Sequence, residues 1–179
     1  MDELTTLRTA RLTLRPFAVA DAERVTQIQS NWHVTRFLRF AAWPPTLELV
    51  REWLIYHAEE WRAGTAYRFA VISEAGLIGC ADIGGIAKGG GDIGYWFDET
   101  AWGRGFATEA ASAVVDFAFE RLGLERLESG RAADNDASGH VLEKLGFTRT
   151  GEGLVWSRPR RAEIRQLWYE LPRARWSDQ

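Results

Sequence analysis

The stretch from residue 92 to residue 123 constrains the fold more than any other part of the chain. It begins with the run DIGYWF (Asp92 to Phe97), whose composition and alternation are typical of a β-strand. A turn containing Gly103 and Gly105 follows, and the segment from Ala107 to Leu122 then carries apolar residues at helical spacing. A strand joined to a helix through a Gly-x-Gly turn exposes backbone N–H groups at the helix N-terminus, so the sequence predicts an anion-binding site there.

Two familiar phosphate-binding loops do not fit this turn. A Rossmann fingerprint requires a third Gly or Ala at the sixth position, where this chain has Thr108. A P-loop requires Gly-Lys followed by Ser or Thr, and the turn has no such sequence. The simpler alternative is a tight turn into a helix with no ligand.

The rest of the chain predicts further strands and helices without a repeat or a low-complexity linker. Thr46 is a typical N-cap and Gly64 a typical stop for a helix between them. A Gly-rich loop is expected at 84–91. The other expected strands are 11–15, 67–73, 77–83, 126–132, 147–153 and 163–171, and the other expected helices are 19–38 and 137–145. The order is therefore βααβββαβαββ within one domain, 1–179.

Composition and charge exclude several classes of partner. Lys and Arg total 22 against 25 Asp and Glu, giving a formal charge of −3 and a pI near 5.7, so no nucleic-acid partner is expected. No run approaches the roughly 18 apolar residues of a membrane span, and the N-terminus MDELTTLRTARLTLR does not resemble a signal peptide. We therefore expect a cytoplasmic protein with no membrane partner.

Cysteine and histidine usage argues against disulfides and metal chemistry. Cys80 is the only cysteine, which excludes an intrachain disulfide and suits a reducing cytosol. His33, His57 and His140 lie far apart and form no HExxH pattern. No metal is expected.

Three motifs occur in order along the chain and carry a family resemblance. They are Trp102-Gly-Arg-Gly-Phe-Ala107 after the strand IGYWF, then Asn135-Asp-Ala-Ser138, and then EKLGF at 143–147. With them the chain resembles the GNAT family of N-acetyltransferases, and particularly its ribosomal-protein alanine acetyltransferase branch. The resemblance covers nearly the whole chain, since the expected order of elements also matches. It implies a GNAT-like α/β fold, with a mixed, mostly antiparallel, twisted sheet flanked by helices.

The resemblance also implies acetyl-CoA as co-substrate. The backbone from Gly103 to Thr108 would wrap its pyrophosphate, although the family consensus has Gln or Arg where this chain has Trp102. The strand at Trp96 and Phe97 would splay from the strand starting at Arg126, leaving a gap for the pantetheine arm. Asn135 and Ser138 would lie beside the coenzyme, or else Asn135 only caps a helix and Ser138 is a surface hydroxyl. The implied coenzyme-binding residues are Trp96, Phe97, Gly103, Arg104, Gly105, Phe106, Ala107, Thr108, Asn135 and Ser138.

Acetyl transfer to an amine requires proton transfer. A free amine is protonated near neutral pH, so a carboxylate or a water chain must accept its proton. Asp92 is the first candidate, because it matches the strand position where some relatives carry a catalytic glutamate, and Asp82 is the second. Either is alternatively a solvated acid at a strand end. The usual family tyrosine falls at Leu142, so Ser138 or a bound water is the expected proton donor to the departing thiolate.

The expected function is an acetyl-CoA-dependent N-acetyltransferase that works by direct attack in a ternary complex. The acceptor is a primary amine, either a protein N-terminus, which the branch favours, or a small molecule. Its binding segments would be the first two helices and the last hairpin, which carry Trp32, Trp43, Trp53 and Trp156. A monomer or a homodimer is expected. The other hypothesis, supported by Leu142, is a catalytically silent acyl-CoA sensor or partner-binding module.

Overall fold

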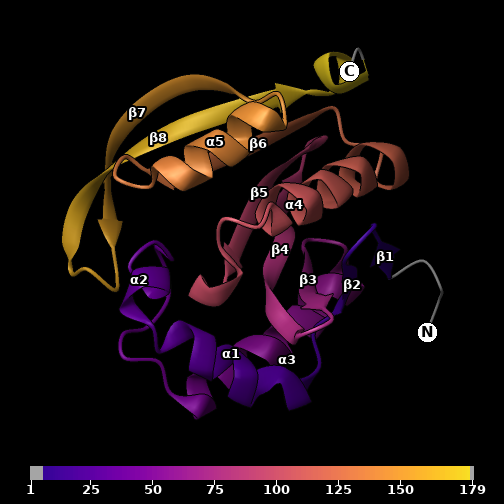
Figure 1. The fold of residues 1–179 in the computed structure, drawn as a ribbon. Helices are drawn as coiled ribbons and strands as arrows, with labels where there is room; N and C mark the ends of the chain where they lie inside the picture. Colours follow the sequence, from indigo (N-terminus) through magenta and orange to yellow (C-terminus); the bar gives the residue numbers. More distant parts are fainter. Residues whose placement is uncertain (1–5, 178–179) are drawn as a thin grey trace.

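The computed structural model describes residues 6–177, which form one eight-stranded sheet with helices on both faces (Figure 1). The strands are β1 (Leu7–Arg8), β2 (Thr13–Pro16), β3 (Tyr67–Ser73), β4 (Gly76–Ala87), β5 (Gly90–Phe97), β6 (Arg126–Ala132), β7 (Thr148–Ser157) and β8 (Ala162–Pro172). The helices are α1 (Ala22–Gln29), α2 (Trp32–Thr35), α3 (Leu47–Ala63), α4 (Phe106–Asp116), α5 (Asp136–Lys144) and α6 (Arg173–Ser177). None of the described helices is long and apolar enough to cross a membrane.

The strands lie in the order β1-β2-β3-β4-β5-β6-β8-β7. Only β5 and β6 run parallel, and every other neighbouring pair is antiparallel. The expected fold class, a mostly antiparallel mixed sheet flanked by helices, is confirmed. The short β1 was not expected, because two residues are too few to show a periodic pattern.

Alternate residues of the central strands pack on opposite faces of the sheet. Phe69, Ile83 and Leu127 belong to a large apolar cluster that includes α4 and α5. Ala70 and Leu77 belong to a smaller cluster with α1 and α3. We call the two sides the α4–α5 face and the α1–α3 face.

Helix α3 has the predicted ends. The Thr46 Oγ1 accepts a hydrogen bond from the Leu49 N–H at 3.3 Å, and Gly64 adopts a left-handed conformation with φ of 68°. Two other expected helices are interrupted. The segment 19–38 divides at Ser30 and Asn31 into α1 and α2, because extended Asn31 caps the second helix by accepting from the His33 N–H. The segment 107–122 is α-helical only to Asp116 and ends in a π-helical turn, Phe117–Arg121.

The prediction of a Gly-rich loop at 84–91 is wrong. β4 continues to Ala87 and β5 begins at Gly90, and these two residues pair across the hairpin. Lys88 and Gly89 form the turn with φ values of 49° and 75°, as a two-residue hairpin turn with both residues at positive φ requires. The glycines here therefore belong to a bulged hairpin. β7 also runs four residues beyond its expected end, to Ser157.

Candidate functional site

The sheet opens between β5 and β6. These strands pair only through Gly90 with Arg126, Gly91 with Leu127, and Asp92 with Glu128. Beyond that point β5 stays with β4 as far as Phe97, and β6 stays with β8 as far as Ala132. The backbone edges that face each other beyond Asp92 are therefore unpaired with each other, apart from a Ser129 Oγ bond to the Ile93 carbonyl at 3.0 Å. The result is a wedge-shaped gap in the sheet.

The N-terminus of α4 follows the open end of β5 after a short connection, residues 98–105. Gly103 and Gly105 have φ values of 72° and 79°, which disfavour residues with a side chain. Gly105 is the N-cap, and it supplies no side-chain hydrogen bond to the first turn. The N–H groups at the start of the helix are thus available to an anion.

Two arginines flank this turn. The guanidinium carbons of Arg11 and Arg104 lie 4.6 Å and 4.7 Å from the centroid of the Phe106 ring. Arg11 donates to the Arg104 carbonyl at 3.0 Å, and it is held by Glu109, whose Oε2 lies 2.7 Å from its Nε. The sequence predicts only a strand at Arg11, because a contact across 98 residues leaves no local pattern.

Several of the expected coenzyme-binding side chains point away from the gap. Phe97 and Phe106 are buried in the core, so only their backbone groups are available to a ligand. Trp96 packs against the α1–α3 cluster. The Trp102 indole N–H donates to the Phe97 carbonyl at 2.9 Å and so ties the glycine turn to the end of β5.

Ser138 and Tyr95 meet across the α4–α5 face. Their hydroxyl oxygens are 3.0 Å apart, and the Tyr95 hydroxyl also lies 3.0 Å from the Ser138 carbonyl. Burial raises the pKa of Tyr95 to about 12, so it stays protonated near neutral pH. Asn135 caps α5, one of the two roles predicted for it, because its Oδ1 accepts a hydrogen bond from the Ser138 N–H. Leu142 is fully buried in the core.

The α1–α3 face of the gap is lined by glycines. β5 and β6 last pair with each other at Asp92 and Glu128, and Gly94 and Gly130 each lie two positions beyond that pair. A Cβ at Gly94 would stand 2.7 Å from the Asp82 Oδ1, and a Cβ at Gly130 would stand 2.1 Å from the Gln166 Nε2. The Asp82 carboxylate and the Gln166 amide therefore lie over the two bare strand edges, one on each side of the gap.

Trp168 lies beside this opening, and its ring packs over three glycines. Its indole would contact a Cβ added at Gly153, Gly130 or Gly151, at 2.6, 3.4 and 3.5 Å. The absence of a side chain at Gly153 above all lets the ring lie against the sheet while 38% of the residue stays exposed. Trp168 thus forms a flat aromatic surface on the α1–α3 face.

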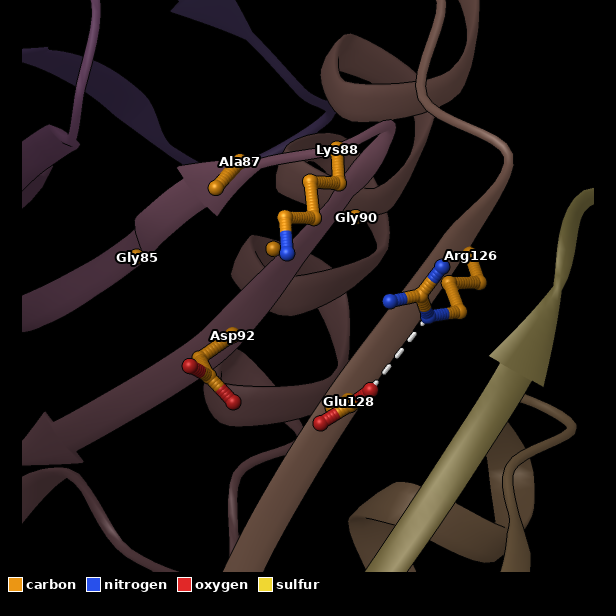
Figure 2. Close-up of a pocket in the computed structure, with 8 residues that line it drawn as sticks. Gly85, Ala87, Lys88, Gly90, Asp92, Arg126 and Glu128 are labelled. Carbon is orange, nitrogen blue, oxygen red and sulfur yellow. Dashed lines mark hydrogen bonds and ion pairs between the residues drawn. The ribbon is translucent and has the colours of Figure 1, made fainter.

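Asp92 lines a hollow of about 300 Å³ at the closed end of the gap (Figure 2). Lys88 and Arg126 also line it, and Arg126 donates to Glu128 at 3.3 Å. Burial raises the pKa of Asp92, and the charges of Glu128 and Asp82 raise it further. The Asp92 Oδ2 would lie 2.9 Å from a Cβ at Gly85, so this carboxylate leans toward β4.

The tip of the β7–β8 hairpin closes one end of the α1–α3 face, beside α2 (Figure 1). Arg160 donates to the Arg36 carbonyl at 2.8 Å and makes a two-pronged contact with Asp134. Of the expected acceptor-binding tryptophans, Trp32 and Trp156 are exposed, and Trp43 packs against Trp32. Trp53 instead packs on Phe17 and His57 among the helices.

Comparisons with known proteins agree with this geometry. A model of the acetyltransferase (GNAT) domain matches residues 11–148. The uncharacterized N-acetyltransferase p20 of Bacillus licheniformis is 31% identical over 150 residues, which is 82% of this chain and 84% of the relative.

Solved structures show the same fold. Ribosomal-protein-S5-alanine acetyltransferase from Vibrio fischeri superposes with a TM-score of 0.84 at 20% identity, covering 96% of this chain and 98% of its own. RimL, a ribosomal L7/L12 alpha-N-protein acetyltransferase in complex with coenzyme A, gives a TM-score of 0.83 at 19% identity, covering 93% and 97%.

The matches assign this chain, with its sheet opened between two parallel strands next to a helix N-terminus without a side-chain cap, to a family of acetyltransferases. The chain belongs to the GNAT family. It is an N-acetyltransferase, which transfers an acetyl group to an amine, and the predicted family and enzyme class are confirmed.

Proposed function

We propose that this enzyme uses acetyl-CoA to acetylate the α-amino group of a protein N-terminus, by direct attack in a ternary complex. The observation that carries the proposal is the gap between β5 and β6, where the two strands no longer pair beyond Asp92 and Glu128. Donor and acceptor enter from opposite faces, so the thioester and the amine meet inside the gap. No covalent acetyl-enzyme is needed.

The donor site combines the glycine turn with the edge of β5. The pyrophosphate binds to the N–H groups at the start of α4, with Arg11 and Arg104 nearby as counter-charges. The pantetheine arm occupies the unpaired edge of β5, where it can bond to backbone groups as a third strand would. The backbone N–H groups of this β5 edge also polarise the thioester carbonyl.

On the acceptor side, we assign the base to Asp82 ahead of Asp92. The Oδ1 of Asp82 lies over Gly94, which is beyond the last residue of β5 that pairs with β6, whereas Asp92 is that last paired residue and its carboxylate leans toward Gly85. The ammonium gives one proton to the carboxylate, and the neutral nitrogen attacks the carbonyl carbon. As the C–N bond forms and the C–S bond breaks, the electron pair leaves on sulfur, which takes up a proton while the nitrogen releases its second.

The Ser138 and Tyr95 hydroxyls are the groups that we assign to the departing thiolate. Both lie on the α4–α5 face, the side from which the donor enters, and their mutual hydrogen bond holds them at the gap. The partly buried Tyr95 supplies a second hydroxyl beside Ser138, since Leu142 stands at the position of the family tyrosine. Ser138 is then the donor to sulfur, directly or through a water.

The acceptor class is supported by the α1–α3 face and by the names of the structural neighbours. Trp168 is exposed there, and Asp82, Asp92 and Glu128 favour a cationic amine. The two solved neighbours are named for ribosomal proteins as acceptors. A peptide, with apolar side chains behind a charged amine, fits this surface better than a small hydrophilic amine. We propose the cytoplasm as the compartment, where such acceptors and the thioester occur together.

The test is coenzyme A release from acetyl-CoA with peptides whose N-terminus is free or blocked, and with a panel of small amines. We expect turnover only with free N-termini and intersecting initial-rate patterns when both substrates are varied. Turnover confined to small amines would contradict the protein acceptor. Parallel, ping-pong patterns would contradict direct transfer.

Gly105→Glu tests the donor site. Acetyl-CoA at about 100 times its dissociation constant adds roughly 2.7 kcal/mol to stability, which a melting experiment detects. A glutamate at Gly105 places a negative charge against the pyrophosphate, so we expect this shift to disappear. Gly123→Glu is the matched control, since Gly123 also has positive φ but lies beyond the far end of α4. A full shift in folded Gly105→Glu would refute the phosphate assignment.

A further inference from the structure

A buried chain of charged side chains lies behind Asp82. Arg68 on β3 donates from Nε and Nη2 to the two carboxylate oxygens of Glu60 on α3, at 3.0 Å and 3.1 Å. Its remaining nitrogen, Nη1, donates to the Asp82 Oδ2 at 3.1 Å. Only 23%, 14% and 15% of the Arg68, Glu60 and Asp82 side chains are exposed. One guanidinium therefore holds two carboxylates, and all three groups are largely withdrawn from solvent.

The two oxygens of Asp82 have different surroundings. Oδ2 accepts from Arg68 and lies 3.7 Å from the Cys80 Sγ. Oδ1 receives no hydrogen bond from any described residue and is the atom that lies over Gly94. Arg68 thus fixes Oδ2 and leaves Oδ1 over Gly94, on the strand that borders the gap.

We propose that Glu60 and Arg68 are positioning residues, which together orient the Asp82 carboxylate toward the amine of the acceptor. This inference rests on the proposed function, in which Asp82 accepts the proton. The two-pronged contact with Glu60 fixes the plane of the guanidinium, so that Nη1 meets Asp82 in one geometry. Neither Glu60 nor Arg68 touches a substrate.

The net charge of Glu60, Arg68 and Asp82 together favours a role in proton transfer over a role only in stabilising the fold. A single carboxylate would neutralise Arg68, and buried ion pairs generally contribute little net stability. The second carboxylate leaves the trio with a net charge of −1 beneath the face where the ammonium binds. That excess negative charge attracts the cationic amine and favours uptake of its proton.

The groups around Asp82 set the direction in which each substitution moves its titration. Burial raises the pKa of Asp82, Arg68 lowers it, and the charge of Glu60 raises it. Cys80 on the same strand is a buried thiol whose own pKa is raised, and Asp92 faces Asp82 from β5. His57 on α3 has a pKa of about 3, because burial and Arg68 lower it, and so it carries no charge near neutral pH.

The experiment is the pH profile of kcat/KM with acetyl-CoA and a peptide bearing a free N-terminus. Glu60→Gln strengthens the hold of Arg68 on Asp82, so the acid limb should move to lower pH by about half a unit or more. Arg68→Gln should move it to higher pH by about one unit and lower kcat by roughly 10²-fold. Arg68→Lys keeps the positive charge but loses the paired guanidinium donors. The acid limb of the profile should therefore return toward that of the wild type, while kcat stays low.

Asp21→Asn is the matched control. Asp21 makes a two-pronged pair with Arg15 at 2.8 Å, far from the gap, so its loss should leave the acid limb unchanged. The ionisation of the peptide is the same in every variant, and only differences between variants count. The melting shift with acetyl-CoA should persist in all of them, which shows that each folds and binds the donor.

Asp82→Asn separates this inference from the proposed function. If Asp82→Asn keeps wild-type turnover at every pH, Asp82 is not the base and the function proposal fails at that step. If it loses turnover while the acid limb stays in place in Glu60→Gln and Arg68→Gln, only the positioning role is overturned. Should Arg68→Gln fail to fold, Glu60→Gln alone decides, since a shift to higher pH or no shift would refute the inference.

Discussion

At the scale of single residues, Cys80 is the thiol nearest to the proposed base, yet it is unsuited to carry an acetyl group. It is fully buried, and burial raises its pKa well above the usual range, with the charge of Asp82 adding to the effect. A buried thiol that remains protonated is a poor nucleophile. Proximity to Asp82 therefore does not make Cys80 a covalent carrier.

We expect Cys80→Ser to keep most of its turnover, because a hydroxyl can keep the contact with Asp82. Intact-mass analysis after incubation with acetyl-CoA alone should show no adduct on the wild-type chain. A stable gain of about 42 Da that is lost in Cys80→Ser, together with ping-pong kinetics, would establish a covalent route instead.

At the scale of elements, the hairpin of β4 and β5 is held together by the close approach of a glycine. A Cβ at Gly79 would lie 2.3 Å from the carbonyl oxygen of Trp96 and 2.7 Å from the Phe97 ring. Backbone cannot move aside cheaply, so the two strands would have to separate. This contact fixes the end of β5 that borders the gap.

Gly79→Ala should therefore cost about 2 kcal/mol of unfolding free energy, as overpacking does in other cores, measured by chemical denaturation. Gly151→Ala is the comparison, because its Cβ would meet only Trp168 at an ordinary 3.5 Å. We expect it to change stability by about 0.5 kcal/mol or less. Equal stabilities of the two variants would show that β4 and β5 are less tightly packed than this contact implies.

At the scale of the whole molecule, His57 couples folding to pH. It is 5% exposed, neither ring nitrogen has a hydrogen-bond partner among residues 6–177, and its pKa is lowered to about 3 by burial and by Arg68. In the unfolded chain its pKa is about 6.5. Protonation therefore favours the unfolded state, and the stability present above pH 6.5 is lost as the pH falls toward 3.

The expected loss from His57 between pH 7 and pH 5 is about 2 kcal/mol. His57→Phe removes the titrating group and keeps a ring against Trp53 and Phe17. Denaturation at both pH values should give a smaller loss for this variant than for the wild type by about that amount. An equal loss in the two proteins would mean that His57 has a polar partner in solution.

The sequence by itself determined the local elements of this protein and the glycine turn that begins α4. The ends of α3, β3 and β6 follow from caps, stops and alternation within a few residues, and the GNAT family follows from three ordered motifs. Where local signals conflicted, as at Asn31 and at the glycines of the β4–β5 turn, the sequence indicated the wrong element.

The tertiary structure alone decided how the site is assembled. Arg11 reaches Glu109 of α4 across 98 residues, Tyr95 meets Ser138 across 43, and Arg68 joins Glu60 on α3 to Asp82 on β4. Such contacts depend on strand register and on which face of the sheet each side chain occupies. Periodicity along the chain carries no information about either, because it describes a residue's own element and not its neighbours in space.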